Sequence, residues 1–545
     1  MKNKIFSIGF VLIANVLLAT QCFAQDTSRM DQVVQSYVDA KQFMGTVLVA
    51  RDDKIIFEKA YGSANLEWNI PNDPTTKFRL GSITKQFTAA SILLLEERGK
   101  LKVEDSIKKY LPGAPASWDK ITLYNLLTHT AGIKNFTDLP EYRALQLAPA
   151  TPAKLMSLLY TLPLDFTPGE KMQYSNSGYI VLGEVIEKLS GMSYERFLQE
   201  NIFNPLGMKD SGYDSNTAII AHRAAGYSSG PNGIRNAEYI DMSVPYGAGA
   251  LYSTTQDLLR WERALFGGKL LSAASFKKMT TPFKSDYAFG LLVNEMNGRK
   301  VIQHNGGIPG FNTNMAYFPE SKMTVVALSN LNGPAPGPIV AKLGALAHGD
   351  SVQLNSERKE ISLAPDTLKK YVGTYALGPN TNMMVTLDGA QLLTQVSGQR
   401  KLPIFPESET HFFVKAVDAQ LEFLEDATGN VTHLVLHQGG RDMKAPRTSD
   451  TVLERHEISL PVETLKRYVG VYELRPGFEL TITFENDQLM AQATGQGKSP
   501  IFPESERSFF SKLVDAHLDF ESNQDGDVTG VVLHQGPTNA RAAKK

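Results

Sequence analysis

Residues 81–99 read GSITKQFTAASILLLEERG, a largely apolar run that begins and ends at a glycine. Positions 83–98 carry few charges and Gly99 is a typical helix stop, so this segment predicts a helix buried inside a domain. Ser82 and Lys85 then lie in its first turn and on one face, with their Cβ atoms about 5 to 6 Å apart. A hydroxyl and an amine so placed indicate nucleophilic catalysis with Lys85 as the base.

The expected surroundings of Lys85 favour its neutral form. Burial and the partial positive charge of a helix N-terminus both disfavour an ammonium group, and a neutral amine can accept the Ser82 proton. The alternative is a helix-capping serine beside a solvated lysine. Ser-x-x-Lys alone is weak support, because it occurs at four other places, starting at Ser106, Ser117, Ser275 and Ser356. Their surroundings are polar, proline-rich, exposed or linker-like, so we expect Ser82 to be the nucleophile.

The second patch is Tyr174-Ser175-Asn176, which lies between a Pro-Gly turn and a helical pattern over residues 177–190. Loops held by rigid elements commonly carry catalytic side chains. Tyr174 can exchange a proton with Lys85, and we expect the lysine cation to favour its phenolate form. Asn176 offers a donor and an acceptor for a substrate amide. The alternative for Tyr174 is a packing role.

The third patch, His304-Asn305-Gly306, ends a short apolar strand and leads into Gly307. Glycines at this point allow the backbone to approach a ligand closely. We expect His304 and Gly306 to contact the substrate, and the N–H groups of Ser82 and Gly307 to form the oxyanion hole. The alternative for His304 is a strand-end histidine bonded to the backbone.

Composition limits the classes of function. The chain has 545 residues, 42% of them hydrophobic, and a formal net charge of -2, which indicates a globular protein of several domains. The sequence contains no basic block, so we expect no nucleic-acid partner.

The N-terminus has the features of a secretory signal over residues 1–24. Lys2 and Lys4 precede an apolar run, and cleavage would follow Ala24. We therefore expect an exported protein, periplasmic or secreted, and no stable membrane span, because the apolar run is short. The single cysteine, Cys22, lies inside this segment, so we expect no disulfides. The alternatives are an uncleaved anchor or a lipoprotein acylated at Cys22.

The C-terminal part of the chain is an internal duplication. Residues 361–439 align without a gap on residues 458–536. Alternating apolar runs separated by turn residues predict two small all-β domains, barrels or sandwiches, over residues 360–446 and 457–541. His437 and His534 recur at the repeat spacing, and we interpret them as strand residues and not as metal ligands. The preceding residues 25–349 form the expected catalytic domain.

The three patches in this order, Ser-x-x-Lys, Tyr-x-Asn and His-x-Gly, resemble the penicillin-recognising serine hydrolases. This superfamily includes class C beta-lactamases, D,D-carboxypeptidases, D-aminopeptidases and esterases. Residues 126–132, 205–208 and 247–254 are similar to it as well. The resemblance implies an α/β (α+β) domain with a central antiparallel sheet and an all-helical subdomain. It also implies that Ser82 is acylated, that Lys85 and Tyr174 exchange its proton, that Asn176 holds the substrate, and that His129 is structural.

One departure bears on the substrate, because many relatives have Lys-Thr-Gly where this chain has His304-Asn305-Gly306. A neutral histidine is a poor partner for a substrate carboxylate. We therefore expect an exported serine hydrolase acting through an acyl-enzyme on peptides or amides containing D-amino acids, or on esters, without a metal or another cofactor. Peptidoglycan fragments are further candidate partners. The alternatives are a beta-lactamase or D,D-carboxypeptidase, and a catalytically silent module that binds or senses cell-wall polymer.

A competing motif is the G-x-S-x-G pattern at residues 226–230. Ser228 with Asp257 and His304 could form a catalytic triad in α/β-hydrolase order. A nucleophile elbow needs a strand before the serine and a helix after it. Pro231-Asn232-Gly233 follows directly, so we expect Ser228 not to be the nucleophile.

Overall fold

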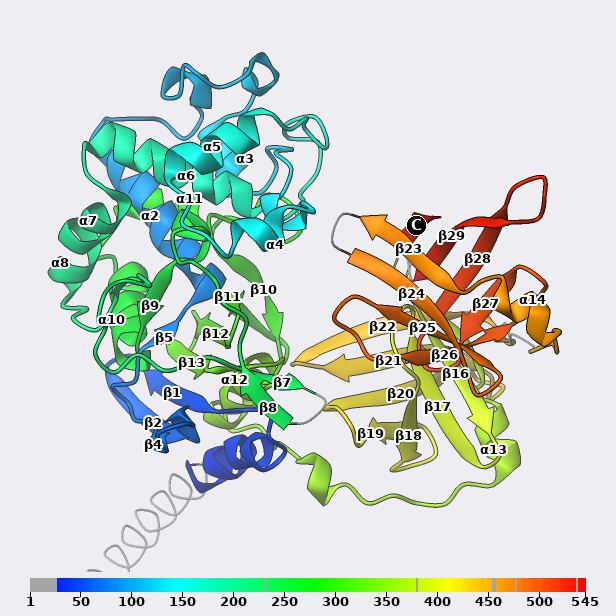
Figure 1. Ribbon diagram of the computed structural model, residues 1–545. Helices are drawn as coiled ribbons and strands as arrows, with labels where there is room; N and C mark the ends of the chain where they lie inside the picture. The colour runs from blue at the N-terminus through cyan, green and yellow to red at the C-terminus, as the bar shows by residue number, and fades with distance from the viewer. Residues whose placement is uncertain (1–26, 231–232, 379–380, 453–456, 476–477, 536–537) are drawn as a thin grey trace, which may run out of the picture. The chain divides into compact units, whose positions relative to one another are not determined.

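The computed structural model describes residues 27–230, 233–378, 381–452, 457–475, 478–535 and 538–545, and the predicted signal at residues 1–24 lies outside them (Figure 1). The chain divides into two compact units, residues 1–352 and residues 353–545. Within the described residues, no helix combines the length and the apolar character needed to cross a membrane.

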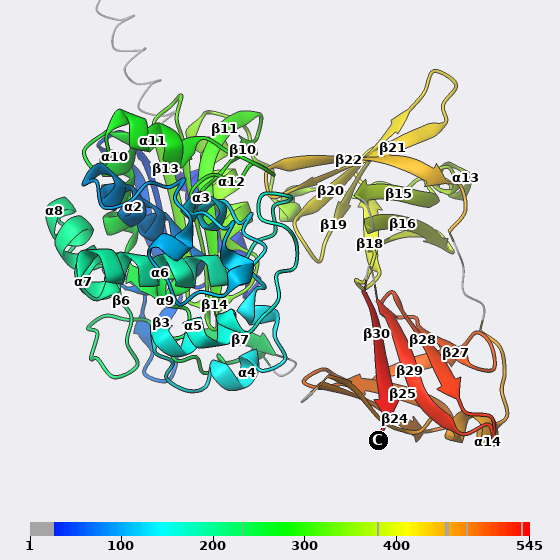
Figure 2. The same ribbon diagram turned by 90° about the horizontal axis from the view of Figure 1, so that it is seen from above.

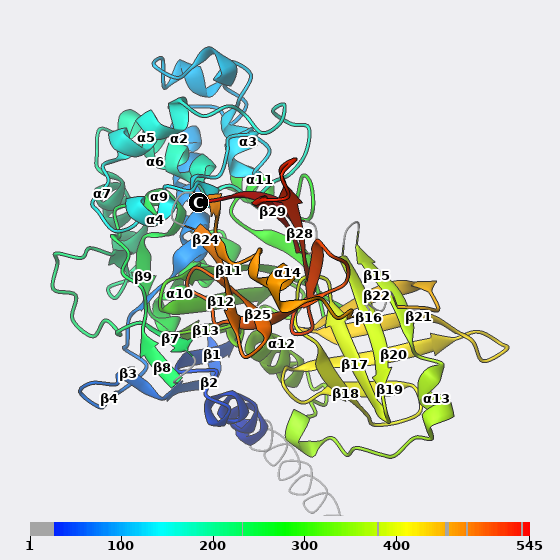
Figure 3. The ribbon, with the colours of Figure 1, turned by 45° about the vertical axis from the view of Figure 1, so that its right-hand side comes forward.

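The first unit is built on a six-stranded antiparallel sheet (Figure 3). Its order is β10 (Leu292–Met296), β11 (Arg299–Ile308), β12 (Phe311–Phe318), β13 (Met323–Ser329), β1 (Gly45–Arg51) and β2 (Lys54–Tyr61). Strand β13 is buried throughout and β1 is buried up to its last residue. Strands covered on both faces are expected to be nearly continuous apolar runs, as these two are.

Helices cover both faces of this sheet. Helix α10 (Thr255–Phe266) packs against β13 and β1, and α12 (Pro336–Ala347) packs against β12 and β13. The ring of Phe266 stacks on Tyr317 at 3.9 Å, whereas Gly344 of α12 faces the ring of Phe318. Adjacent strand residues point to opposite sides of a sheet, so the two helices lie on opposite faces.

The helical part of this unit surrounds α2 (Thr84–Glu97), which packs against α6 (Asn176–Ser190), α9 (Tyr246–Gly249) and α11 (Ala273–Thr280). Twelve successive residues of α2, from Thr84 to Leu95, are buried, as its apolar sequence predicts. The buried Gln86 accepts a hydrogen bond at its Oε1 from Trp261 Nε1 at 2.9 Å. The single turn η1 (Gly81–Ile83) leads into α2. The helix is thus the expected one, and Ser82 lies in the turn that precedes it.

The second unit consists of two closed antiparallel barrels (Figure 2). The first contains β15 (Gly373–Gly378), β16 (Thr381–Asp388), β17 (Gln391–Val396), β18 (Leu402–Pro406), β19 (His411–Val414), β20 (Ala419–Glu425), β21 (Val431–Gln438) and β22 (Arg441–Ser449). The second contains β23 (Gly470–Arg475), β24 (Phe478–Glu485), β25 (Gln488–Ala493), β26 (Ser499–Pro503), β27 (Ser508–Ser511), β28 (Ala516–Ser522), β29 (Val528–Gln535) and β30 (Thr538–Lys544).

The two barrels share register and core. Each strand of the second begins 97 residues after its counterpart, from Gly373 and Gly470 to Arg441 and Thr538. The same buried tyrosine contact recurs: Tyr375 Oη donates to the Tyr371 carbonyl at 2.8 Å, and Tyr472 Oη donates to the Tyr468 carbonyl at 2.7 Å. The fold-class prediction, an α/β catalytic domain followed by two small all-β domains, is therefore confirmed, and the β domains are barrels.

Candidate active site

The three sequence patches meet at the start of α2. Ser82 is in η1, Lys85 in the first turn of α2, Asn176 in the first turn of α6, and His304 on β11. Lys85 Nζ lies 3.0 Å from Ser82 Oγ and 2.8 Å from Asn176 Oδ1. It lies 4.8 Å from the centre of the Tyr174 ring. Residues 91 positions apart in the sequence, Lys85 and Asn176, thus meet at one site.

The partners of Lys85 are suited to a neutral amine. Two of its neighbours are carbonyl oxygens, Asn176 Oδ1 and the backbone oxygen of Ala248, the latter at 2.9 Å. A neutral amine has two N–H donors and one lone pair. When both donors are used on these oxygens, the lone pair is left for the hydroxyl proton of Ser82.

Electrostatics favour this protonation state. The Lys85 side chain is fully buried, and desolvation lowers its pKa well below the usual range of lysine. Among the residues that the structure describes, no carboxylate is hydrogen-bonded to Lys85. The lysines of two other Ser-x-x-Lys motifs have acidic partners. Lys109 pairs with Asp105 at 3.0 Å and Lys278 pairs with Glu96 at 3.0 Å, and the pKa of each is raised. Of these three lysines, Lys85 is therefore the one most readily present as a neutral amine, the form that can accept a proton.

Tyr174 lies close to Ser82, which places a phenol beside this hydroxyl. Burial raises the pKa of Tyr174 above that of free tyrosine, and this effect exceeds the lowering by the Ser82 contact. The expectation of a favoured phenolate is therefore wrong. Burial keeps Tyr174 protonated at neutral pH.

Asn176 is held in place by its own neighbours. Its backbone N–H donates to Asn135 Oδ1 at 3.0 Å, and its side-chain Nδ2 lies 3.4 Å from Thr137 Oγ1. The Nδ2 contact leaves Oδ1 directed at Lys85, which fixes the orientation of the amide. Residues Asn135 and Thr137 belong to the segment around η4 (Phe136–Asp138), which the sequence patterns did not single out.

Glycines bring β11 close to the turn that contains Ser82. Gly81 has φ of +56°, and a Cβ at this position would lie 2.8 Å from the backbone nitrogen of Gly307. A Cβ on Gly306 would lie 1.9 Å from the Leu80 carbonyl oxygen. Gly307 is exposed whereas Gly306 is buried. Close packing therefore explains Gly306, and its expected contact with substrate stays a prediction.

His304 is buried, and both of its ring nitrogens have protein partners. Nδ1 lies 2.6 Å from the Asn305 carbonyl oxygen and must donate to it, so Nε2 accepts from Tyr287 Oη at 3.0 Å. Desolvation by burial lowers the pKa of His304 to about 4. His304 is thus neutral at pH 7, and its two hydrogen bonds hold its ring in place. Its expected contact with substrate remains a prediction.

The sequence patterns missed Tyr287 and the Ala248 carbonyl. Tyr287 is buried against His304 and against His129, whose ring centre lies 4.5 Å away. His129 Nδ1 accepts from the Ser175 N–H at 3.2 Å, so His129 supports the loop of the second patch. No local pattern around Tyr287 signals this role, because it depends on pairing across the fold.

The competing triad is not assembled. Ser228 lies on β7 (Tyr227–Gly230), which pairs with β8 (Gly233–Asn236), and its Oγ donates to Asn332 at 2.9 Å. Asp257 accepts from Ser211 at 2.8 Å and pairs with Arg260. Neither is recorded in contact with His304, and the strand after Ser228 excludes an elbow.

Comparison with known proteins agrees with this geometry. The chain is 32% identical over 442 residues to penicillin-binding protein 4* of Bacillus subtilis (strain 168), covering 75% of this chain and 95% of the relative. It is 27% identical to the teichoic acid D-alanine hydrolase of Staphylococcus aureus (strain MRSA252), covering 54% and 72%. The octameric penicillin-binding protein homologue from Pyrococcus abyssi superimposes with a TM-score of 0.56 and 25% identity, covering 77% and 100%.

Family comparison covers most of the chain beyond the N-terminus. Residues 357–448 and 454–543 each match a domain of unknown function, DUF3471, so one family describes both barrels. Residues 30–349, which contain all three patches, match the beta-lactamase family. The protein belongs to the beta-lactamase family, the serine hydrolases related to penicillin-binding proteins.

Proposed function

We propose that this protein is an exported serine hydrolase that forms an acyl-enzyme on Ser82, with Lys85 as general base. The observation that carries the proposal is the environment of Lys85. A fully buried amine with two carbonyl acceptors and a hydroxyl at 3.0 Å is equipped to remove the proton of that hydroxyl.

Acylation follows from these contacts. Ser82 Oγ attacks the substrate carbonyl carbon while its proton passes to Lys85 Nζ. The N–H groups of Ser82 and Gly307 stabilise the negative charge on the carbonyl oxygen. The tetrahedral intermediate then collapses, and the leaving nitrogen takes a proton from Tyr174, which recovers one from Lys85. Water later repeats the sequence on the acyl-enzyme and releases the acid.

The proposed substrates are amides or peptides of D-amino acids, or esters. Neutral His304 supplies no cation for a substrate carboxylate at neutral pH, which disfavours D,D-carboxypeptidase and beta-lactamase activity. The relative named teichoic acid D-alanine hydrolase is consistent with a D-aminoacyl ester. Peptidoglycan fragments fit the same chemistry when they carry an amide at the scissile position.

A pocket next to the second patch suits an apolar substrate side chain. It has a volume of about 330 Å³ and is lined mainly by apolar residues, among them Phe136, Tyr142, Leu145 and Leu158. Phe136 donates its N–H to Ser177 Oγ at 2.9 Å, one residue beyond Asn176. We propose that this pocket favours bulky D-amino acids over D-alanine.

The test is a substrate panel with the purified protein: D- and L-aminoacyl amides, D-Ala-D-Ala peptides, p-nitrophenyl esters and nitrocefin. We expect hydrolysis of D-aminoacyl amides or esters that disappears in Ser82→Ala and persists in Ser228→Ala. Preference for nitrocefin or D,D-peptides would favour the alternative enzymes. No turnover of any substrate, with no covalent product on Ser82, would favour the silent wall-binding module.

Export rests on the N-terminal pattern. In a bacterial host that secretes the protein, we expect the mature chain to begin at Gln25, which mass spectrometry of its N-terminus would show. A mature chain that retains Cys22 with an attached lipid would contradict this prediction.

A further inference from the structure

Two histidines and an aspartate converge on the outer face of the second barrel. His517 and Asp519 lie on β28, and His534 lies directly opposite His517 on β29. Their neighbours Leu518 and Phe520 point into the barrel core, so the alternation of the strand places His517 and Asp519 on the outside. All three ligand atoms lie within 4.8 Å of one another.

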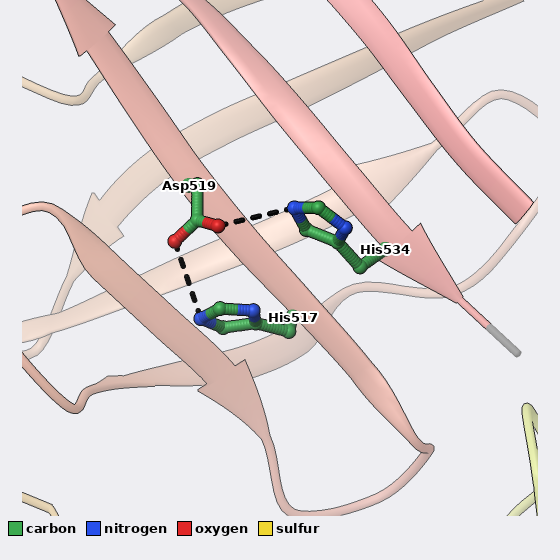
Figure 4. Close-up of side chains that lie close together, drawn as sticks. All are labelled: His517, Asp519 and His534. Carbon is green, nitrogen blue, oxygen red and sulfur yellow. Dashed lines mark ion pairs between the residues drawn. The ribbon is translucent and has the colours of Figure 1, made fainter.

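The carboxylate of Asp519 lies between the two imidazoles (Figure 4). Its Oδ2 is 3.0 Å from His534 Nε2, and its Oδ1 is 3.3 Å from His517 Nε2. Ligand atoms around a tetrahedral Zn²⁺ with bonds of 2.0 to 2.2 Å are separated by about 3.3 Å. These two separations are close to those around a bound ion, and the third, between the two imidazole nitrogens, is at most 4.8 Å.

Neighbouring groups orient the ligands. His534 Nδ1 lies 2.8 Å from Asn539 Oδ1, and donation to this oxygen leaves the lone pair of neutral His534 on Nε2, facing Asp519. Ser508 Oγ donates to Asp519 Oδ1 at 2.6 Å. A lone pair directed at a carboxylate is repulsive unless a proton or a metal ion lies between them. Hydrogen bonds that orient the ligands, as those of Asn539 and Ser508 do here, are typical of metal sites.

We propose that the second barrel binds a divalent transition-metal ion of the zinc class through His517 Nε2, His534 Nε2 and Asp519. Two imidazoles and one carboxylate suit Zn²⁺ and exclude a preference for Ca²⁺ or Mg²⁺, which select oxygen ligands. Glu504, whose Oε2 lies 3.6 Å from His517 Nε2, is placed to supply a fourth ligand. The ion would join β28 and β29 to the turn after β26.

The first barrel provides an internal control. At the repeat spacing, Gln420 corresponds to His517, Glu422 to Asp519 and His437 to His534. His437 has two acidic neighbours, Asp442 at 2.7 Å and Glu422 at 3.4 Å, whereas Asn539 stands at the position of Asp442 in the second barrel. Gln420 takes the place of one imidazole there. His411 on β19 is another imidazole near Glu422, 3.8 Å from its Oε1, but among the described residues only the second barrel brings three ligand atoms within 4.8 Å of one another. The proposal thus reverses the sequence-based interpretation of His534 and keeps that of His437.

The test uses the mature full-length protein after removal of metal with a chelator. We expect isothermal titration with Zn²⁺ at neutral pH to give one site per chain of micromolar or tighter affinity, and Co²⁺ to give the visible absorption bands of a tetrahedral complex. His517→Gln, which copies the first barrel, should weaken Zn²⁺ binding at least 100-fold and abolish the bands. His437→Gln should leave both signals intact.

Thermal unfolding separates loss of the site from loss of the fold. We expect Zn²⁺ to raise the unfolding temperature of the wild type and His437→Gln but not that of His517→Gln, with all three equal in the presence of chelator. The proposal fails if wild type takes up no Zn²⁺ at micromolar concentration, or if His517→Gln binds as tightly as wild type. Equal effects of Ca²⁺ and Zn²⁺ would also overturn it.

Discussion

Replacing Asn176 by aspartate places a negative charge where an amide oxygen now lies, 2.8 Å from Lys85 Nζ. The two side chains have nearly the same shape, so the change tests charge with little change in packing. A carboxylate at this distance stabilises the ammonium form of Lys85 and therefore raises its pKa. The general base is then protonated at pH values where the wild-type lysine is neutral.

The size of the effect follows from the distance. Two unit charges 2.8 Å apart attract each other by about 6 kcal/mol at an effective dielectric constant of 20, which corresponds to about 4 pKa units. Desolvation of the new carboxylate offsets part of this energy. We expect the pKa of Lys85 to rise by at least about 2 units, so kcat/KM on the acidic limb falls at least about 100-fold.

The assay is the pH dependence of kcat/KM for the best substrate of the panel, in wild type, Asn176→Asp and Asn176→Ala. In wild type, kcat/KM should rise with pH through a lowered Lys85 pKa and then level off. The limb of Asn176→Asp should move to higher pH and recover activity there, whereas Asn176→Ala should lose activity without an upward move. An unchanged limb in Asn176→Asp, with an unfolding temperature near wild type, would refute Lys85 as the base.

Three further predictions address the rest of the site. Gly81→Ala should lower kcat/KM by at least about 100-fold for every substrate, because its Cβ would lie 2.8 Å from the Gly307 nitrogen of the proposed oxyanion hole. Activity equal to that of the wild type would exclude Gly307 from that role. Tyr174→Phe should slow amide hydrolysis by about 100-fold or more, yet slow p-nitrophenyl ester hydrolysis far less, because p-nitrophenolate leaves without a proton. Equal losses in the two reactions would contradict a proton-donating Tyr174. Leu145→Asp should lower the kcat/KM ratio of D-phenylalanine amide to D-alanine amide, and an unchanged ratio would exclude the pocket from substrate selection.

Local sequence patterns predicted much of this architecture. The apolar run after Ser82 gave the buried helix α2, which ends within one residue of the expected position. The ungapped alignment of the repeats anticipated two similar β domains, and all eight strand pairs follow its spacing. Both predictions rest on periodicity along the chain, which a single sequence shows directly.

Contacts between distant segments were not predictable in the same way. The acceptor that Ala248 offers to Lys85 joins residues 163 apart in sequence, and the pairing of His517 with His534 depends on strand register. The predicted direction of the Tyr174 pKa shift was wrong for a different reason. A neutral Lys85 and a phenolate stabilised by its cation are incompatible expectations, and burial of both side chains decides in favour of two neutral groups.

Covalent labelling tests the central claim most directly. The protein is incubated with a fluorophosphonate or a penicillin and then digested, and the masses of its peptides are measured by mass spectrometry. We predict one adduct, located on the peptide that contains Ser82, present in wild type and Ser228→Ala and absent in Ser82→Ala. An adduct on Ser228, or labelling that persists in Ser82→Ala, would contradict the assignment of the nucleophile.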